Sequence, residues 1–170
     1  MEPGLGYGVA VEPHLIPTGG NIMRLINVLF ICRHNSGRSQ IAEAYLRKFG
    51  GERFHVESAG YEPAGQVNPL VVAVMREEGI DLSDKKPQSV FGLFKQGRLF
   101  EHVITVCSDS EGECPVFPGI TRRWHIPFPD PAAAEGTHDQ KLARVREIRD
   151  AIKAMILTPP EKEFDFRTLS

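Results

Sequence analysis

The fold is decided by residues 25–49, which read LINVLFICRHNSGRSQIAEAYLRKF. Residues 25–31 are an almost unbroken apolar and β-branched run, which is typical of a strand buried on both faces of a parallel sheet. The polar and small residues 32–39 follow, and residues 40–49 then place Ile41, Tyr45 and Phe49 on one helical face. We therefore expect a strand, a short loop and a helix in direct succession.

The alternation of strands and helices continues along the chain. Further strands are predicted over 54–58, 102–106 and 123–126. Further helices are predicted over 70–78, with Asn68 as the N-cap and Pro69 in the first turn, over 88–96 and over 142–156. Such alternation indicates βαβ units, whose right-handed crossovers place helices on both faces of a parallel sheet. The sequence therefore predicts a single α/β domain.

The two ends of the chain depart from this pattern. Residues 1–22 contain five Gly and three Pro and show no hydrophobic period, so we expect an extension that is disordered, without a fold of its own. The domain is expected over residues 23–157. The tail 158–170 is Pro-rich and charged, and we expect it to fray.

Length and composition limit the kind of protein. The chain has 170 residues, 41% of them hydrophobic and 25% charged, with a formal net charge of −2, so it resembles an ordinary globular protein with no basic excess for nucleic acid. No apolar run approaches the length of a membrane span, and no signal peptide is visible. Three cysteines are too few for a disulfide scaffold. We expect a cytoplasmic protein that binds neither nucleic acid nor a membrane.

The loop between the first strand and the first helix carries the clearest chemistry. It lies at the carboxyl end of a strand, where open α/β sheets bind ligands, and its backbone N–H groups together with the helix start suit a tetrahedral oxyanion. The same environment favours the thiolate of Cys32, and the guanidinium of Arg38 is placed to grip two oxygens of the anion. The blander alternative is a buried Cys that ends a strand and a surface Arg. The predicted oxyanion-binding residues are Arg33, His34, Asn35, Ser36, Gly37, Arg38 and Ser39.

A second candidate lies after the fourth predicted strand, in Pro127-Phe128-Pro129-Asp130-Pro131. The prolines on both sides of Asp130 restrict this loop, and a carboxyl group above an anion site can act as a general acid. The residues alone leave a plain Asp-Pro turn as the alternative.

Two further cysteines follow the third predicted strand. Cys107 ends this strand, so parallel pairing places it at the same sheet edge as Cys32, and Cys114 lies seven residues further on. The spacing does not fit a zinc site, and no metal is expected. The residues leave two possibilities open: a small core residue with an incidental second Cys, or a relay in which thiols exchange disulfides.

Four segments carry a family resemblance: ICRHNSGRSQIAEAYLR (31–47), ESAG (57–60), GIDLS (79–83) and VITVCSDSEGECPVFPG (103–119). They resemble the low-molecular-weight tyrosine phosphatase and arsenate reductase superfamily over residues 24–155, and the last segment resembles the thioredoxin-coupled arsenate reductases. The resemblance implies a four-stranded parallel sheet and makes Asp130 the catalytic acid. Some members bind a potassium ion near the loop, but Lys86 and Gln88 stand here where ion-binding oxygens would be needed.

The resemblance implies an enzyme that reduces arsenate to arsenite. Cys32 would be the nucleophile, Cys107 and Cys114 the relay, and thioredoxin the external reductant, with no bound cofactor. The alternative is a phosphatase for phosphotyrosine or other phosphomonoesters, which acts through a phosphocysteine and ignores the relay cysteines. Residues 132–136 lack the aromatic side chains that tyrosine phosphatases usually carry there, which disfavours this alternative. A non-catalytic oxyanion sensor is disfavoured because the Cys, Arg and Asp set is intact.

Overall fold

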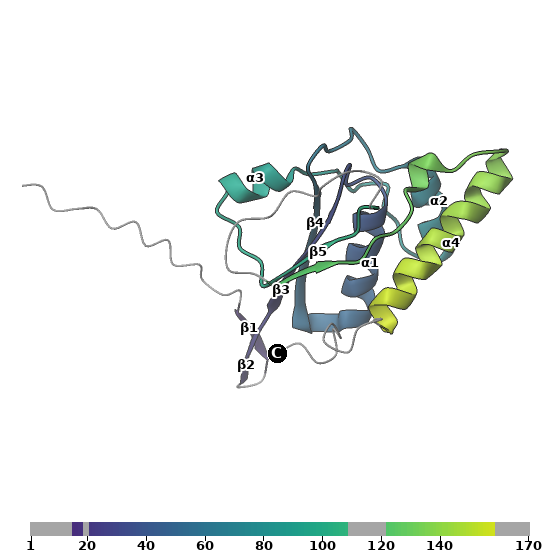
Figure 1. Cartoon of the computed structure of the whole chain (residues 1–170). Helices are drawn as coiled ribbons and strands as arrows, with labels where there is room; N and C mark the ends of the chain where they lie inside the picture. The colour runs from purple at the N-terminus through teal and green to yellow at the C-terminus, as the bar shows by residue number, and fades with distance from the viewer. Residues whose placement is uncertain (1–14, 19–20, 109–121, 159–170) are drawn as a thin grey trace, which may run out of the picture.

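The computed structural model describes residues 15–18, 21–108 and 122–158 (Figure 1). Its strands are β1 (Leu15–Thr18), β2 (Asn21–Arg24), β3 (Ile26–Cys32), β4 (Phe54–Gly60), β5 (His102–Thr105) and β6 (Arg122–His125). Its helices are α1 (Arg38–Gly50), α2 (Pro69–Glu77), α3 (Val90–Lys95) and α4 (His138–Leu157), with short 3-10 turns at Gly51–Arg53 and Pro131–Ala133. Every strand and helix predicted for the domain is present, with ends that differ by a few residues.

Strands β3 to β6 form one parallel sheet in the order β4-β3-β5-β6. β3 has a neighbour on each side, and six of its seven residues are buried. This position explains the apolar sequence of β3, because a central parallel strand has both faces covered. The prediction of a four-stranded parallel sheet is confirmed.

Helices cover both faces of the sheet, as predicted. Figure 1 shows α1, α2 and α4 on one side and α3 on the other. The side chains of β3 divide between the two faces: Val28 and Phe30 pack in the larger core, and Leu29 and Ile31 pack in the smaller core with α3. The sheet is therefore the middle layer of three.

Helix ends follow local sequence signals. Asn68 caps α2 by accepting a hydrogen bond from the backbone N–H of Leu70 at 2.9 Å, and Pro69 occupies the first turn as predicted. α4 begins at His138, earlier than its apolar stripe suggests, because Thr137 and Gln140 form a capping box. This Thr-x-x-Gln pattern is readable in the sequence.

The amino-terminal extension contains one regular element. β1 and β2 pair as an antiparallel hairpin with Leu15 opposite Arg24 and Thr18 opposite Asn21, whereas the sequence predicts no fold before Met23. Each of the two strands has only four residues, and the Gly and Pro residues of this segment do not predict a strand. The hairpin leads directly into β3 and lies at the margin of the domain (Figure 1).

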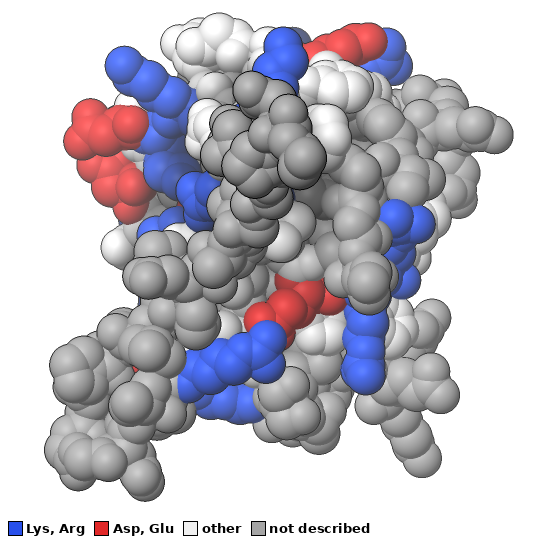
Figure 2. Space-filling view, turned by 90° about the vertical axis from the view of Figure 1, so that its left-hand side faces the viewer, with Lys and Arg blue, Asp and Glu red and all other residues white. Residues whose placement is uncertain are grey.

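The described surface gives little information on binding partners. On the face that Figure 2 shows, Lys and Arg side chains lie in several places, and Asp and Glu side chains lie next to some of them. No helix within residues 15–18, 21–108 and 122–158 has the length and apolar character to cross a membrane. The expected absence of nucleic-acid and membrane partners stays a prediction.

Candidate active site

The loop between β3 and α1 holds its peptide groups in a defined orientation. The carbonyl oxygens of Arg33, His34 and Ser36 accept hydrogen bonds from backbone N–H groups of the segment 62–68, at 2.8–2.9 Å. The carbonyl of Asn35 accepts from Gln40 Nε2 at 3.1 Å. Because these carbonyls are engaged outside the loop, the N–H ends of the peptide groups are available on its inner side, as in an anion-binding nest.

Cys32 lies at the floor of this loop and is 2% exposed. Its Sγ is 2.9 Å from Ser39 Oγ, and the backbone N–H of Asn35 donates to it at 3.2 Å. The first turn of α1, which begins at Arg38, adds the positive end of a helix dipole. The sulfur therefore lies against a backbone donor and the start of a helix, an arrangement that is typical of reactive cysteines.

Asn35 shapes the loop from within. Its backbone has a φ of 50°, a left-handed conformation that Asn adopts more readily than most residues, and its side chain is fully buried. Asn35 Nδ2 donates to Ser39 Oγ at 2.8 Å and to Ser58 Oγ at 2.9 Å, and its Oδ1 accepts from the backbone N–H of Gln88 at 2.9 Å. One side chain thereby ties the loop to α1, to β4 and to the segment before α3.

Gly60, at the end of β4, lets the loop approach the sheet. A Cβ atom at this position would lie 2.7 Å from the carbonyl oxygen of Arg33 and 2.8 Å from the backbone N of Asn35. Both contacts are with backbone, so a side chain at Gly60 would displace the loop. The site therefore requires a glycine at position 60. The sequence alone does not indicate this requirement.

Arg38 and Asp130, the predicted clamp and the predicted acid, lie next to each other at the loop. Arg38 is 2% exposed, donates to the carbonyl of Phe128 at 3.2 Å and lies 3.7 Å from Asp130 Oδ2. Asp130 is 27% exposed and accepts from the backbone N–H of Ala132 at 2.9 Å, which orients its carboxylate. The predicted clamp and the predicted acid are thus side by side, although 92 positions separate them in the numbering.

Cys107 follows β5 and lies beside the end of β3. Its side chain is fully buried, and its Sγ donates to the carbonyl of Ile31, the residue before Cys32, at 3.9 Å. Both cysteines are free thiols. Cys114, the second cysteine of the predicted relay, lies outside the described residues.

Two of the predicted oxyanion-binding residues, Arg33 and His34, have side chains that contact Glu62. The side chain of Arg33 pairs with Glu62 at 3.0 Å, and a ring nitrogen of His34 lies 2.9 Å from the carbonyl oxygen of Glu62. Both side chains are therefore held against the segment after β4. Arg38 and Ser39 remain candidates for side-chain contact. No group of three or more His, Cys, Asp or Glu in the described part of the chain is arranged to hold a metal.

Sequence reasoning missed the residues that support the loop from behind. Ser58 Oγ donates to Glu43 Oε2, and Glu43 Oε1 accepts from Lys85 Nζ at 2.8 Å. Gln88 Nε2 also donates to the carbonyl of Ser58 at 2.8 Å. Glu43 lies two positions from both Ile41 and Tyr45, so it is outside the apolar face of the predicted helix, and the sequence carries no signal for its role.

Comparison with known proteins agrees with this geometry. Residues 27–156 match the model of a family described as low molecular weight phosphotyrosine protein phosphatase. A curated Bacillus licheniformis protein named arsenate reductase is 40% identical over 126 residues, which cover 74% of this chain and 88% of that protein. A crystal structure of arsenate reductase from Archaeoglobus fulgidus is 34% identical, with a TM-score of 0.52 over 74% of this chain and 98% of that one. A structure titled an arsenate reductase in the phosphate binding state is 26% identical, with a TM-score of 0.53 over 78% of this chain and 99% of that one.

Proposed function

Because the chain belongs to the low molecular weight phosphotyrosine protein phosphatase family, we propose that it uses the Cys32 loop to reduce arsenate to arsenite. Relatives named arsenate reductase that span most of the domain support this activity. The observation that carries the proposal is the second buried thiol, Cys107, beside the strand end that holds Cys32. A phosphatase has no use for that thiol, whereas a two-electron reduction requires a second sulfur.

The first step is attack of the Cys32 thiolate on the arsenic of bound arsenate. Loop N–H groups and the guanidinium of Arg38 hold the oxyanion, and an arsenic–sulfur bond forms while an arsenic–oxygen bond breaks. Asp130 protonates the departing oxygen, which leaves as water. Arsenic remains pentavalent at this stage.

The second step is the reduction. The Cys107 thiolate attacks Cys32 Sγ, a sulfur–sulfur bond forms, and the electron pair of the broken arsenic–sulfur bond stays on arsenic, which departs as arsenite. Cys114 then attacks Cys107, Cys32 leaves as a thiolate, and a Cys107–Cys114 disulfide stores the oxidation. Thioredoxin, as an external dithiol, reduces this disulfide. We place this chemistry in the cytoplasm, a reducing compartment in which thioredoxin keeps thiols reduced.

The second candidate function is hydrolysis of a phosphomonoester. The family description names phosphotyrosine protein phosphatase, and the same Cys32, Arg38 and Asp130 set supports a phosphocysteine that water then hydrolyses. This route moves no electrons, so Cys107 and Cys114 would be dispensable for it.

The deciding experiment compares two activities in three proteins. Wild type, Cys107→Ser and Cys114→Ser are assayed for arsenate reduction with thioredoxin, thioredoxin reductase and NADPH, and for hydrolysis of p-nitrophenyl phosphate. We expect both variants to lose arsenate turnover and to keep any phosphatase activity of the wild type. Peptide mapping after arsenate treatment should find Cys32 joined to Cys107 in Cys114→Ser.

A single-turnover measurement completes the test. Without reductant, one arsenite should form per enzyme, because one disulfide stores two electrons. Arsenate turnover that survives both substitutions would refute the relay and leave an external small thiol or the phosphatase reaction. Absence of arsenate reduction in the wild type would refute the main proposal.

A further inference from the structure

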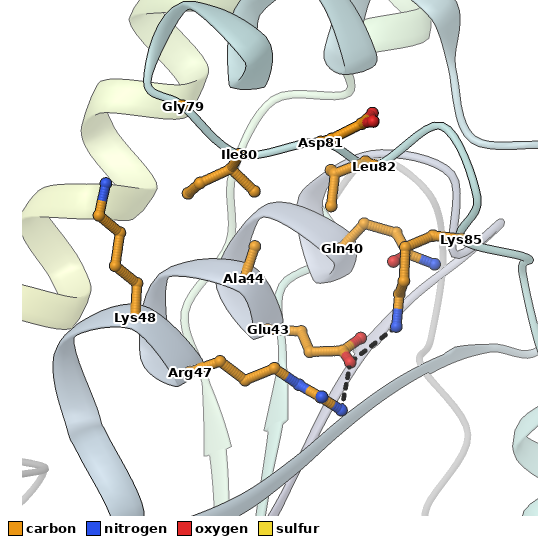
Figure 3. A pocket seen from close by; sticks show the side chains of 10 residues that line it. All are labelled: Gln40, Glu43, Ala44, Arg47, Lys48, Gly79, Ile80, Asp81, Leu82 and Lys85. Carbon is orange, nitrogen blue, oxygen red and sulfur yellow. Dashed lines mark hydrogen bonds and ion pairs between the residues drawn. The ribbon is translucent and has the colours of Figure 1, made fainter.

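A cavity of about 490 Å³ lies between α1 and the segment that follows α2 (Figure 3). One wall is the side of α1 that carries Gln40, Ala44 and Lys48, which are spaced four residues apart and therefore share a helix face. The opposite wall belongs to residues 79–85. Pockets of this volume commonly hold small molecules. No residue of the oxyanion loop, 32–39, lines the cavity, so it is separate from the candidate active site.

The middle of the cavity is apolar. Ala44 of α1 and Ile80 from the opposite wall are partly buried and pack against the larger hydrophobic core, and Leu82 is a buried member of that core. Figure 3 shows these three side chains between the polar groups at the two ends of the cavity. The middle therefore suits the apolar body of a ligand, which would be removed from water there.

Gln40, at one end of the cavity, has an acceptor without a donor. Its Nε2 donates to the carbonyl oxygen and to Oδ1 of Asn35, both at 3.1 Å, and because both partners are acceptors the nitrogen must face Asn35. Gln40 Oε1 is then turned away from Asn35. The side chain is 1% exposed, and Oε1 has no hydrogen-bond partner among the residues that the structure describes. Buried acceptors are rarely left unpaired, so this end calls for a ligand with a hydroxyl or N–H group.

Lys48 lies at the other end of the cavity (Figure 3). Its ammonium group donates to the carbonyl of Glu78 at 3.2 Å, and within residues 15–18, 21–108 and 122–158 it forms no ion pair with a carboxylate. The other two cations that line the cavity, Arg47 and Lys85, are both paired with Glu43 at 2.8 Å. An ammonium group has three donors, so Lys48 can bind an anionic group of a ligand and keep its bond to Glu78.

Neither of the two carboxylates that line the cavity opposes an anion at Lys48. Glu43 is 3% exposed and is neutralised by its two cations. Asp81 accepts from the backbone N–H of Ser83 at 2.9 Å and pairs with Arg76 at 3.5 Å, and Figure 3 shows its carboxylate directed away from the other lining side chains. The lining therefore carries three cations against two engaged carboxylates, a balance that favours an anionic ligand.

We propose that this cavity binds a small organic carboxylate that has an apolar body and a hydroxyl group at its far end. The hydroxyl group donates to Gln40 Oε1, the apolar body lies against Ala44, Ile80 and Leu82, and the carboxylate binds Lys48. Gln40 and Lys48 are two helical turns apart, about 12 Å along the axis, and the side chain of Lys48 leans back towards the start of α1. An aromatic ring with a short carboxylate arm matches this span. The proposal goes beyond the proposed function and uses none of its residues.

The test compares three related compounds by isothermal titration calorimetry on the full chain. The probe is 3-(4-hydroxyphenyl)propionate, which carries the hydroxyl group, the ring and the carboxylate. We expect 3-phenylpropionate, which lacks the hydroxyl group, to bind roughly three- to tenfold more weakly, the effect of one hydrogen bond of ordinary net strength. The alcohol 3-(4-hydroxyphenyl)propan-1-ol lacks the charge and should bind about two- to fivefold more weakly, as for one exposed ion pair.

Two variants locate the probe in the cavity. Lys48→Ala should bind the probe no more tightly than the wild type binds the alcohol, and its affinity for the alcohol should be unchanged. Ala44→Leu places a larger side chain in the middle of the cavity and should abolish binding, while leucine remains a good helix former. The thermal midpoint of each variant verifies that it is folded. Lys95→Ala is the matched control, because Lys95 is an exposed lysine of α3 that does not line the cavity.

Inorganic phosphate distinguishes the cavity from the oxyanion loop. At constant ionic strength, phosphate should leave the affinity for the probe unchanged, whereas competition would place the probe in the loop and overturn the proposal. Absence of binding, equal affinities for the three compounds, or wild-type affinity for the probe in Lys48→Ala would also overturn it. Failure of the proposed function is separate, because a protein that does not reduce arsenate can still bind the probe, and arsenate reduction without binding would remove this inference alone.

Discussion

Arg38 shows how much of this site depends on one side chain. Its guanidinium is almost fully buried, donates to the carbonyl of Phe128 and lies beside the carboxylate of Asp130. A planar group with several donors can satisfy these partners and still present N–H groups to an oxyanion, whereas an ammonium group cannot match that geometry.

We predict that Arg38→Lys lowers the kcat for arsenate by about 10²-fold, the effect of losing a preorganised donor to the transition state. The measurement is steady-state turnover with the thioredoxin system. Arg76→Lys is the control, since Arg76 is a surface residue paired with Asp81 and should show wild-type kinetics. Unchanged kcat and KM in Arg38→Lys would show that Arg38 is not the clamp.

Asp130 is the second residue whose role a substitution can isolate. Asp130→Asn keeps the acceptor for the backbone N–H of Ala132 but removes the acid, so we predict a fall in kcat of about 10²-fold or more. Asp130→Glu keeps a carboxyl group and should retain more activity than Asp130→Asn. Equal losses in the two variants, measured in the same turnover assay, would point to the shape of the loop and not to proton transfer.

At the scale of elements, α2 and α4 are joined by an ion cluster. Glu77 of α2 accepts from Arg146 Nε at 3.0 Å and from Arg149 Nη1 at 2.9 Å, both on α4. The hydrogen bond from Arg146, followed by that from Arg149, lowers the pKa of Glu77 from 4.5 to about 2. The cluster therefore favours the folded state only while Glu77 is ionised.

The pH dependence of this cluster has a definite sign. Because the folded state lowers the pKa of Glu77, its stabilising contribution is complete above the unfolded value of 4.5 and is lost as the pH falls towards about 2. We predict that the free energy of unfolding of Glu77→Gln differs most from wild type above about pH 5 and approaches the wild-type value near pH 2. Urea denaturation over a series of pH values measures this difference.

A matched substitution on α4 controls for the loss of a carboxylate. Glu147 pairs with Arg144 within the same helix, so Glu147→Gln removes a surface ion pair that joins no two elements. Its effect should be smaller, because an exposed ion pair within one helix contributes little to the free energy of unfolding. A pH-independent difference for Glu77→Gln would contradict the assigned role of the cluster.

At the scale of the whole molecule, the site forms where the carboxyl ends of the parallel strands lie side by side. The carboxyl ends of β3, β4 and β5 bring Cys32, Gly60 and Cys107 together, and the segment after β6 adds Asp130. The backbone N–H of Phe128 donates to the carbonyl of Val106 at 3.3 Å, which ties the acid-bearing segment to the end of β5. The chemistry thus depends on four segments that meet only in the folded domain.

The extension before the domain should be dispensable. β1 and β2 pair with each other, and an isolated two-stranded hairpin is marginally stable in water, while the core begins at Ile26. We predict that a chain starting at Met23 keeps the thermal midpoint and arsenate turnover of the full chain. A fall in Tm of more than about 5 °C, which corresponds to more than 1 kcal/mol for a domain of this size, would mean that residues 1–22 stabilise it.

The sequence by itself determined what is encoded locally. An apolar run specified the buried strand, Asn68 and Pro69 specified a helix start, and the spacing of Cys32 and Arg38 identified the loop. Each signal lies within a few residues, where propensity and periodicity act. The four-residue hairpin strands were missed because they are too short for a period to show.

Only the tertiary structure decided which distant groups support that loop. Gly60 is needed because β4 brings it against the backbone of Arg33, and Lys85 pairs with Glu43 from 42 residues away. Arg38 meets the carbonyl of Phe128 across 90 residues. Such pairings follow from sheet register and helix packing, which fix the position of whole elements at once, and no local pattern of residue types records which elements will meet.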